Sequence, residues 1–159
     1  ANVQNQVIGV FSKALCRPMA EVLKRLGSQH VLIVHAEVGL DEISISGKTF
    51  IAELKNKEIT EYTLSASDFG IAENNLDGLS VSSAAESLEL IKSALGKASD
   101  ERSAKARDII TLNAGAAIYA SGLADTLSEG VDRAADSIGS GLALTKMADL
   151  TSFTRVFSS

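Results

Sequence analysis

Apolar and β-branched residues form short uninterrupted runs early in the chain. The runs Val7–Phe11 and His30–His35 are of the kind found in buried parallel strands. Between them, Pro18 suits the first turn of a helix, and Gly27 suits the residue after its last turn. The pattern predicts a strand–helix–strand unit of roughly thirty residues with a right-handed crossover.

The helix of this unit carries an apolar stripe, and a hairpin is predicted after the second strand. The stripe has the spacing i, i+3, i+4, i+7, which predicts one apolar face, made of Met19, Val22, Leu23 and Leu26. The segments Thr49–Leu54 and Glu58–Leu64 are short and partly alternating, with three polar residues between them. We therefore expect a β-hairpin at an edge of the sheet. Residues 65–82 are polar and irregular, which predicts a surface loop.

Helical patterns dominate the second half of the chain. Ser83 with Glu86, and Thr126 with Glu129, have the spacing of capping boxes, which mark helix N-termini. Three apolar stripes follow at helical spacing: Leu88, Ile91 and Leu95; Ile109, Leu112, Ala116 and Tyr119; and Leu127, Val131, Ala134 and Ile138. We expect the last two stripes to face each other and to pack over the sheet.

Two further segments complete the predicted fold. Residues 97–107 are charged and are expected to be exposed and partly helical, and a last helix is expected over residues 141–150. The fold class predicted is α/β, as part of a mixed, mainly parallel sheet with an edge β-hairpin, covered by C-terminal helices. The chain shows no internal repeat and no second domain.

Composition narrows the classes of function. The chain has 159 residues, of which 45% are hydrophobic and 22% charged, so a single packed domain is expected. Its net charge of −5 gives no electrostatic support for nucleic-acid binding. The apolar runs are too short to span a bilayer, and the single Cys16 cannot form an internal disulfide. These features predict a cytoplasmic protein without a nucleic-acid or membrane partner.

Two adjacent acids, Asp41 and Glu42, follow the second predicted strand. In open α/β sheets, ligands collect at the carboxyl ends of the parallel strands. Mg²⁺ prefers oxygen ligands and is commonly held by one or two carboxylates together with substrate phosphates. An adjacent acid pair is also ordinary in a solvated turn, which is the commoner explanation in soluble proteins. The residues alone leave both interpretations open.

The other side chains that could take part in chemistry are better explained by structural roles. His30 and His35 bracket a strand, but no third metal ligand accompanies them at a convincing spacing, which favours structural histidines. Cys16 has no evident activating partner, so a buried, inert thiol is expected. The chain contains no glycine-rich phosphate loop, Walker motif or GxSxG element. It therefore lacks the parts needed to hold a large substrate alone.

Three segments carry a resemblance to a known family. They are QVIGVFSKALCRPMAEVLKRLGS (residues 6–28), VLIVHAEVGLDEIS (31–44) and RDIITLNAGAAIYASGLADTLSEGV (107–131). Together they resemble the C-terminal half of the anthranilate phosphoribosyltransferase family, over nearly the whole chain. Ala36 stands where that family often has Gly, and Val38 where it often has a polar residue.

The resemblance implies a reaction and a site. The family transfers the phosphoribosyl group of phosphoribosyl pyrophosphate (PRPP) to the amine of anthranilate in tryptophan biosynthesis, with Mg²⁺ at the leaving pyrophosphate. Its metal-binding acid pair matches Asp41 and Glu42, and no catalytic or substrate-binding residue is carried over to this stretch. Residues 1–159 would then be the C-terminal portion of the α/β domain. The early strands and the N-terminal helical domain that makes the family's homodimer would be absent.

Two other functions remain as alternatives from the same architecture. One is a non-enzymatic relative that binds nucleic acid, which the acidic net charge and the intact run Gly39–Glu42 disfavour. The other is a pyrimidine nucleoside phosphorylase, against which the match over residues 107–131 argues. On the transferase reading, the 159-residue chain alone is expected to be inactive.

Overall fold

A computed structural model describes residues 3–96 and 98–157. Its elements are the strands β1 (Asn5–Gly9), β2 (His30–Ala36), β3 (Thr49–Lys55) and β4 (Glu58–Leu64), the short 3-10 turns η1 (Lys13–Leu15) and η2 (Ala66–Phe69), and the helices α1 (Cys16–Arg25), α2 (Ala84–Leu95), α3 (Glu101–Ala120), α4 (Leu127–Gly139) and α5 (Leu142–Arg155). Lys97 of the predicted charged segment lies outside the described residues.

The sheet is mixed, with the strand order β1-β2-β3-β4. β1 pairs with β2 in parallel, whereas the β2–β3 and β3–β4 pairs are antiparallel. The predicted strand–helix–strand unit and the edge hairpin are thus confirmed, and parallel pairing within the described sheet is confined to β1 and β2. The hairpin turns through Asn56 and Lys57, both with positive φ, as a two-residue turn of the primed type requires.

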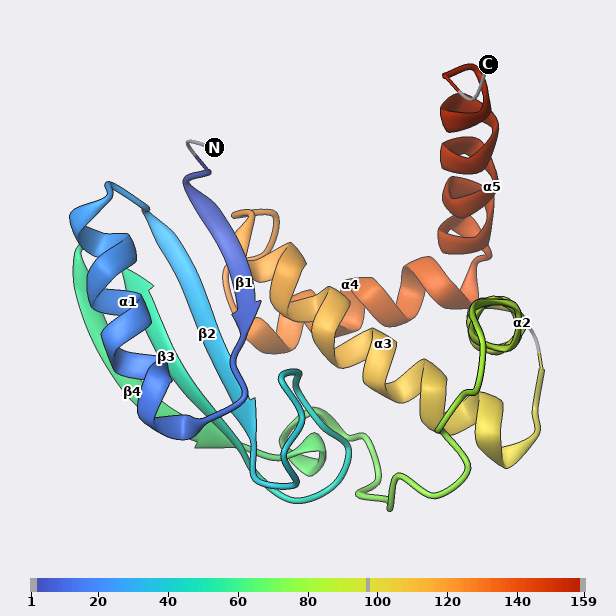
Figure 1. The fold of residues 1–159 in the computed structure, drawn as a ribbon, viewed down its shortest axis with the longest axis horizontal. Coiled ribbons are helices and arrows are strands. Elements are labelled where there is room, and N and C mark those ends of the chain that lie inside the picture. The colour runs from blue at the N-terminus through green and yellow to red at the C-terminus, as the bar shows by residue number, and fades with distance from the viewer. Residues whose placement is uncertain (1–2, 97, 158–159) are drawn as a thin grey trace.

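Three layers pack on one another (Figure 1). Successive side chains of a strand point to opposite faces, so β2 serves two cores. Val31 and Ile33 pack with Cys16 and Ala20 of α1 on one face. On the other face, the second core joins strand, loop and helix residues, among them Leu32, Val34, Ile43, Ile45, Leu112, Ala116 and Val131. The predicted facing stripes of α3 and α4 are therefore confirmed.

Close approach of α3 and α4 depends on a glycine. A Cβ atom built on Gly130 of α4 would overlap the carbonyl oxygen of Gly115 on α3. The two helices are close enough at this crossing that a larger residue would push them apart. α5 follows α4 and stands away from the sheet, with Leu150 and Phe153 exposed (Figure 1).

The helices α2 and α4 begin where the sequence predicts, but one hydrogen bond of each capping box differs from the expected pattern. The hydroxyls of Ser83 and Thr126 accept hydrogen bonds from the backbone N–H of Glu86 and Glu129. The glutamate carboxylates, however, accept from the backbone N–H of Ser82 and Asp125, one residue before the cap. The helix starts are therefore confirmed, while the return bond of the capping box is shifted by one residue.

Three expectations need correction. The buried face of α1 is Cys16, Ala20 and their neighbours Met19 and Leu23, whereas Val22 and Leu26 are 50% and 69% exposed. The small side chains of Cys16 and Ala20 allow close packing on the sheet and turn the helix away from the predicted stripe.

The second correction concerns the charged segment 97–107, which was expected to be exposed. Most of it forms the start of α3, and several of its side chains are buried. Lys105 is 5% exposed, and its ammonium group lies 2.9 Å from a carboxylate oxygen of Glu101 and 2.8 Å from the amide oxygen of Asn75. The third concerns the last helix, which runs to Arg155 rather than to Leu150. No glycine or proline occurs within α5 to end it earlier.

Candidate functional site

The acid pair lies in the loop that leaves the carboxyl end of β2. Gly39 donates its backbone N–H to the carbonyl oxygen of Ala36 at 2.9 Å, and Ala36 donates its own N–H to the carbonyl oxygen of Leu40 at 2.9 Å. The chain therefore turns sharply within four residues of the strand. Asp41 and Glu42 come directly after this turn, as the sequence predicted.

The loop also touches the carboxyl end of β1. A Cβ atom built on Gly9, the last residue of β1, would overlap the carbonyl oxygen of Asp41. Only a glycine fits this backbone contact without moving the loop. The acid pair consequently lies beside the carboxyl ends of both parallel strands, where ligands of open α/β sheets collect.

The residues after the pair are anchored in the core. Ile43 and Ile45 are 1% and 0% exposed, and the side chain of Ser44 accepts a hydrogen bond from the backbone N–H of Ser46 at 2.9 Å. The backbone N–H of Ser44 donates to the hydroxyl of Thr49 at 3.2 Å. Residues 43–46 form no strand, but these hydrogen bonds and the burial of Ile43 and Ile45 fix their backbone.

The two carboxylates themselves are free. Asp41 and Glu42 are exposed, and neither side chain makes a hydrogen bond or ion pair with another described residue. No cluster of three or more His, Cys, Asp or Glu side chains able to hold a metal occurs in the described parts of the chain. The donor set therefore fits Mg²⁺ shared with phosphate and water oxygens, rather than a cation enclosed by protein ligands alone.

A buried polar network at the other end of β2 was not predicted. The carboxylate of Glu53 on β3 is 8% exposed and accepts three hydrogen bonds. The donors are Nε2–H of His30 at 2.9 Å, the hydroxyl of Tyr119 at 2.8 Å and the hydroxyl of Tyr62 at 2.9 Å. Lys55 adds a bond from its ammonium group to the Tyr119 hydroxyl at 3.0 Å.

This network is structural rather than catalytic in form. Burial, reinforced by the neighbouring Glu53, raises the pKa of Tyr62, so its hydroxyl stays protonated and donates. The ring of His30 also packs edge-on against Tyr119, with 4.6 Å between ring centroids. His30 is thus a structural histidine, as the sequence favoured.

His35 and Cys16 are likewise accounted for. The ring N–H at Nδ1 of His35 donates to the carbonyl oxygen of Val10 at 2.8 Å and joins the ends of β1 and β2. Cys16 is buried, and burial, with a smaller contribution from Glu61, raises the pKa of its thiol. A raised pKa disfavours the reactive thiolate. The expected burial of Cys16 is confirmed.

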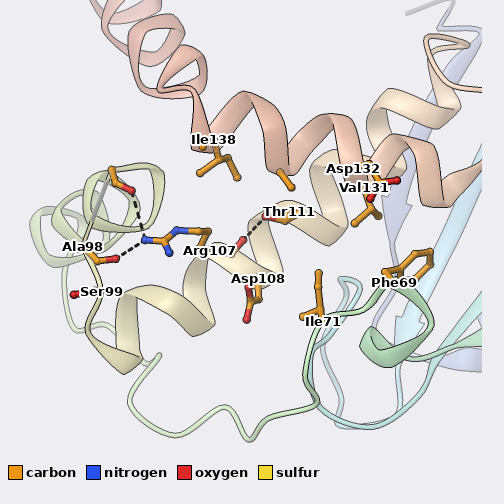
Figure 2. Close-up of a pocket in the computed structure, with 13 residues that line it drawn as sticks. Phe69, Ile71, Ala98, Ser99, Arg107, Asp108, Thr111, Val131, Asp132 and Ile138 are labelled. Atoms are coloured by element: carbon orange, nitrogen blue, oxygen red, sulfur yellow. Dashed lines mark hydrogen bonds between the residues drawn. The ribbon is translucent and has the colours of Figure 1, made fainter.

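A hollow of about 420 Å³ opens between α3, α4 and the loops beside them (Figure 2). Phe69 and Ile71 line one side, and Arg107 reaches the carbonyl oxygens of Ala94, Gly96 and Ala98. Burial raises the pKa of the Asp108 carboxyl at its rim, against the smaller lowering effect of Arg107. Neither Asp41 nor Glu42 lines this hollow.

Comparisons with known proteins give one consistent result. The sequence model described as the a/b domain of the glycosyl transferase family matches residues 1–144. The chain is 59% identical over 157 residues to the anthranilate phosphoribosyltransferase of Hahella chejuensis, covering 99% of this chain and 45% of that protein. It is 57% identical over 157 residues to the enzyme of the same name from Marinobacter nauticus, covering 99% and 46%.

Solved structures agree on the fold. The anthranilate phosphoribosyltransferase of Thermus thermophilus superposes with a TM-score of 0.80 at 32% identity, over 92% of this chain and 42% of that one. The Saccharomyces cerevisiae enzyme in complex with PRPP and Mg superposes with a TM-score of 0.75 at 29% identity, over 89% and 40%. The chain thus spans about 45% of the length of the curated relatives it matches. None of the helices in residues 3–96 and 98–157 combines the length and apolarity needed to cross a membrane.

Proposed function

The chain belongs to the glycosyl transferase family, whose a/b domain matches residues 1–144, and on this premise we propose that it is the C-terminal half of an anthranilate phosphoribosyltransferase. The complete protein would join C1 of PRPP to the amine nitrogen of anthranilate, as the bond from C1 to pyrophosphate breaks. The observation that carries the proposal is an identity of 57–59% to curated enzymes of that name over 99% of the chain.

The acid pair supplies the metal-binding part of this proposal. Asp41 and Glu42 would hold Mg²⁺ at the carboxyl edge of β1 and β2, since their carboxylates are exposed and free of other described partners. When bound there, Mg²⁺ neutralises the charge that develops on the leaving pyrophosphate. The anchored loop on either side keeps the two carboxylates at this edge, with the buried Ile43 directly after them.

The rest of the site is expected to come from outside these residues. The relatives are about twice as long as this chain, and we assign no anthranilate-binding or ribose-phosphate-binding residue within it. The remaining polypeptide would supply those contacts, the early strands and the helical domain of a homodimer. The acidic net charge and the biosynthetic relatives support a cytoplasmic enzyme without a nucleic-acid partner.

The proposal is tested by activity of the full-length polypeptide that carries this sequence. Anthranilate is fluorescent, so its consumption can be followed directly with PRPP and Mg²⁺ present and with each left out in turn. We expect consumption only with both present. Phosphate-dependent cleavage of uridine or thymidine without anthranilate consumption would instead show a pyrimidine nucleoside phosphorylase.

A further inference from the structure

Asn113 of α3 makes an unusual two-way contact with the loop that carries the acid pair. Its Oδ1 accepts a hydrogen bond from the backbone N–H of Ile43 at 2.9 Å, and its Nδ2 donates to the carbonyl oxygen of Ile43 at 2.8 Å. The second N–H of the same amide group donates to the carbonyl oxygen of Ile109 at 2.9 Å, one turn earlier in α3. One side chain thus binds both polar groups of one loop residue and ties them to a helix.

The contacted residue is the one that directly follows the acid pair. Asp41 is constrained on its other side, because its backbone lies against Gly9. The backbone of the pair is therefore held at Asp41 by its contact with β1 and, directly after Glu42, by the bonds from α3 to Ile43. α3 is anchored in the core around Asn113, because Leu112 and Ala116 are 1% and 0% exposed.

We propose that Asn113 is a positioning residue for the acid pair, which holds Asp41 and Glu42 in one arrangement before a divalent cation binds. This inference rests on the proposed metal role of the pair. A loop that is ordered beforehand loses less conformational freedom on binding, so the cation binds more tightly. Only a side-chain amide offers both a donor and an acceptor in this geometry; Asp lacks the donor, and Leu lacks both.

The test measures cation binding rather than turnover. Mn²⁺ alone is titrated into the full-length polypeptide carrying this sequence, and the free ion is followed by its electron paramagnetic resonance signal. Asn113→Ala, and Asn113→Leu, which keeps the number and branching of the side-chain heavy atoms but removes both polar groups, should each raise the dissociation constant about 10-fold, at the lower end of the effect of removing a direct partner of a metal ligand. Thr111→Val is the matched control, because the Thr111 hydroxyl donates to the carbonyl oxygen of Arg107 within α3 and makes no hydrogen bond to the acid-pair loop among the described residues.

A purely structural role predicts a different set of results. It would lower the unfolding temperature of the Asn113 variants while their Mn²⁺ affinity, measured well below that temperature, matched that of Thr111→Val; this outcome would overturn the proposal. Hydrogen–deuterium exchange needs no variant: the backbone amide of Ile43, which donates to Asn113, should be protected in the unaltered protein, and exchange of this amide at the rate of an unstructured peptide would also overturn the proposal.

The double variant Asp41→Asn with Glu42→Gln separates this inference from the proposed function. If it binds Mn²⁺ as tightly as the unaltered protein, the metal role of the pair is wrong, and the positioning role is lost with it. If the double variant loses Mn²⁺ binding but the Asn113 variants do not, the metal role stands and only the positioning role is wrong.

Discussion

Removing the buried carboxylate of Glu53 should be among the most damaging single changes in the sheet. In Glu53→Ala, the three donors that converge on this carboxylate, from His30, Tyr62 and Tyr119, lose their common acceptor. His30 and Tyr119 are 8% and 9% exposed, so water cannot readily replace the lost bonds. Tyr62 is less buried and contributes less.

The magnitude follows from these contacts. A buried group left without its partner costs about 1–3 kcal/mol, and breaking a buried charged cluster costs about 3–5 kcal/mol. Two buried donors therefore give an expected loss of about 3–5 kcal/mol for Glu53→Ala. This is a large part of the about 5–15 kcal/mol that stabilises a typical domain. Glu53→Gln keeps the volume and one acceptor oxygen, so about 1–2 kcal/mol is expected.

The assay is urea unfolding at pH 7, followed by circular dichroism in the far ultraviolet. Glu58→Ala is the control, because Glu58 is exposed on β4 and its side chain makes no hydrogen bond or ion pair with another described residue. Its effect should stay within about 0.5 kcal/mol. If Glu53→Ala lowers the free energy of unfolding no more than Glu58→Ala does, the network stabilises nothing and the reasoning is refuted.

Three further predictions concern the core, a helix N-terminus and the isolated chain. Leu112→Ala should cost about 2–5 kcal/mol in urea unfolding, since Leu112 is 1% exposed; a smaller loss with the fold unchanged would contradict its place in the core. Hydrogen bonds from Ser82 and, to a smaller extent, from Arg102 lower the pKa of the Glu86 carboxyl to about 2. The stability that this carboxylate contributes should therefore be complete above about pH 4.5 and be lost as the pH falls towards 2, and Glu86→Gln should remove that part of the acid dependence. Residues 1–159 expressed alone should self-associate in light scattering and consume no anthranilate, because Phe11 and Phe153 are 81% and 64% exposed; an active monomer would contradict this.

Local patterns predicted the elements well, because each depends on residues close together in sequence. The strand around His30–His35 and the hairpin Thr49–Leu64 follow from β-branched runs and a short polar turn. The starts of α2 and α4 follow from Ser83 and Thr126, whose hydroxyls satisfy helix N–H groups only three residues away.

Which face of a helix is buried depends on what lies across from it. The apolar positions of α1 form two overlapping stripes that share Met19 and Leu23, and periodicity alone cannot choose between them. The sheet selects the stripe with the small Cys16 and Ala20, and Val22 is left half exposed. The same limit explains why the charged start of α3 was expected to be exposed.

Partners far apart in sequence were beyond prediction. Glu53 reads as an ordinary polar position in an alternating strand, and the donors that satisfy it are 23, 9 and 66 residues away. Asn113 similarly meets Ile43 across 70 residues. The acid pair, by contrast, was found from its place after a strand, but its metal role rested on family resemblance rather than on its residues.

The Mg²⁺ dependence of anthranilate consumption tests the metal role of the acid pair most directly. The full-length polypeptide carrying this sequence is compared with its Asp41→Asn, Glu42→Gln double variant, and with Glu37→Gln, an exposed acid of the same loop whose side chain makes no hydrogen bond or ion pair with another described residue. The pair should be needed most at limiting Mg²⁺, where activity of the double variant is predicted to fall sharply while Glu37→Gln keeps its activity. Turnover by the double variant equal to that of the unaltered protein at limiting Mg²⁺ would contradict the account.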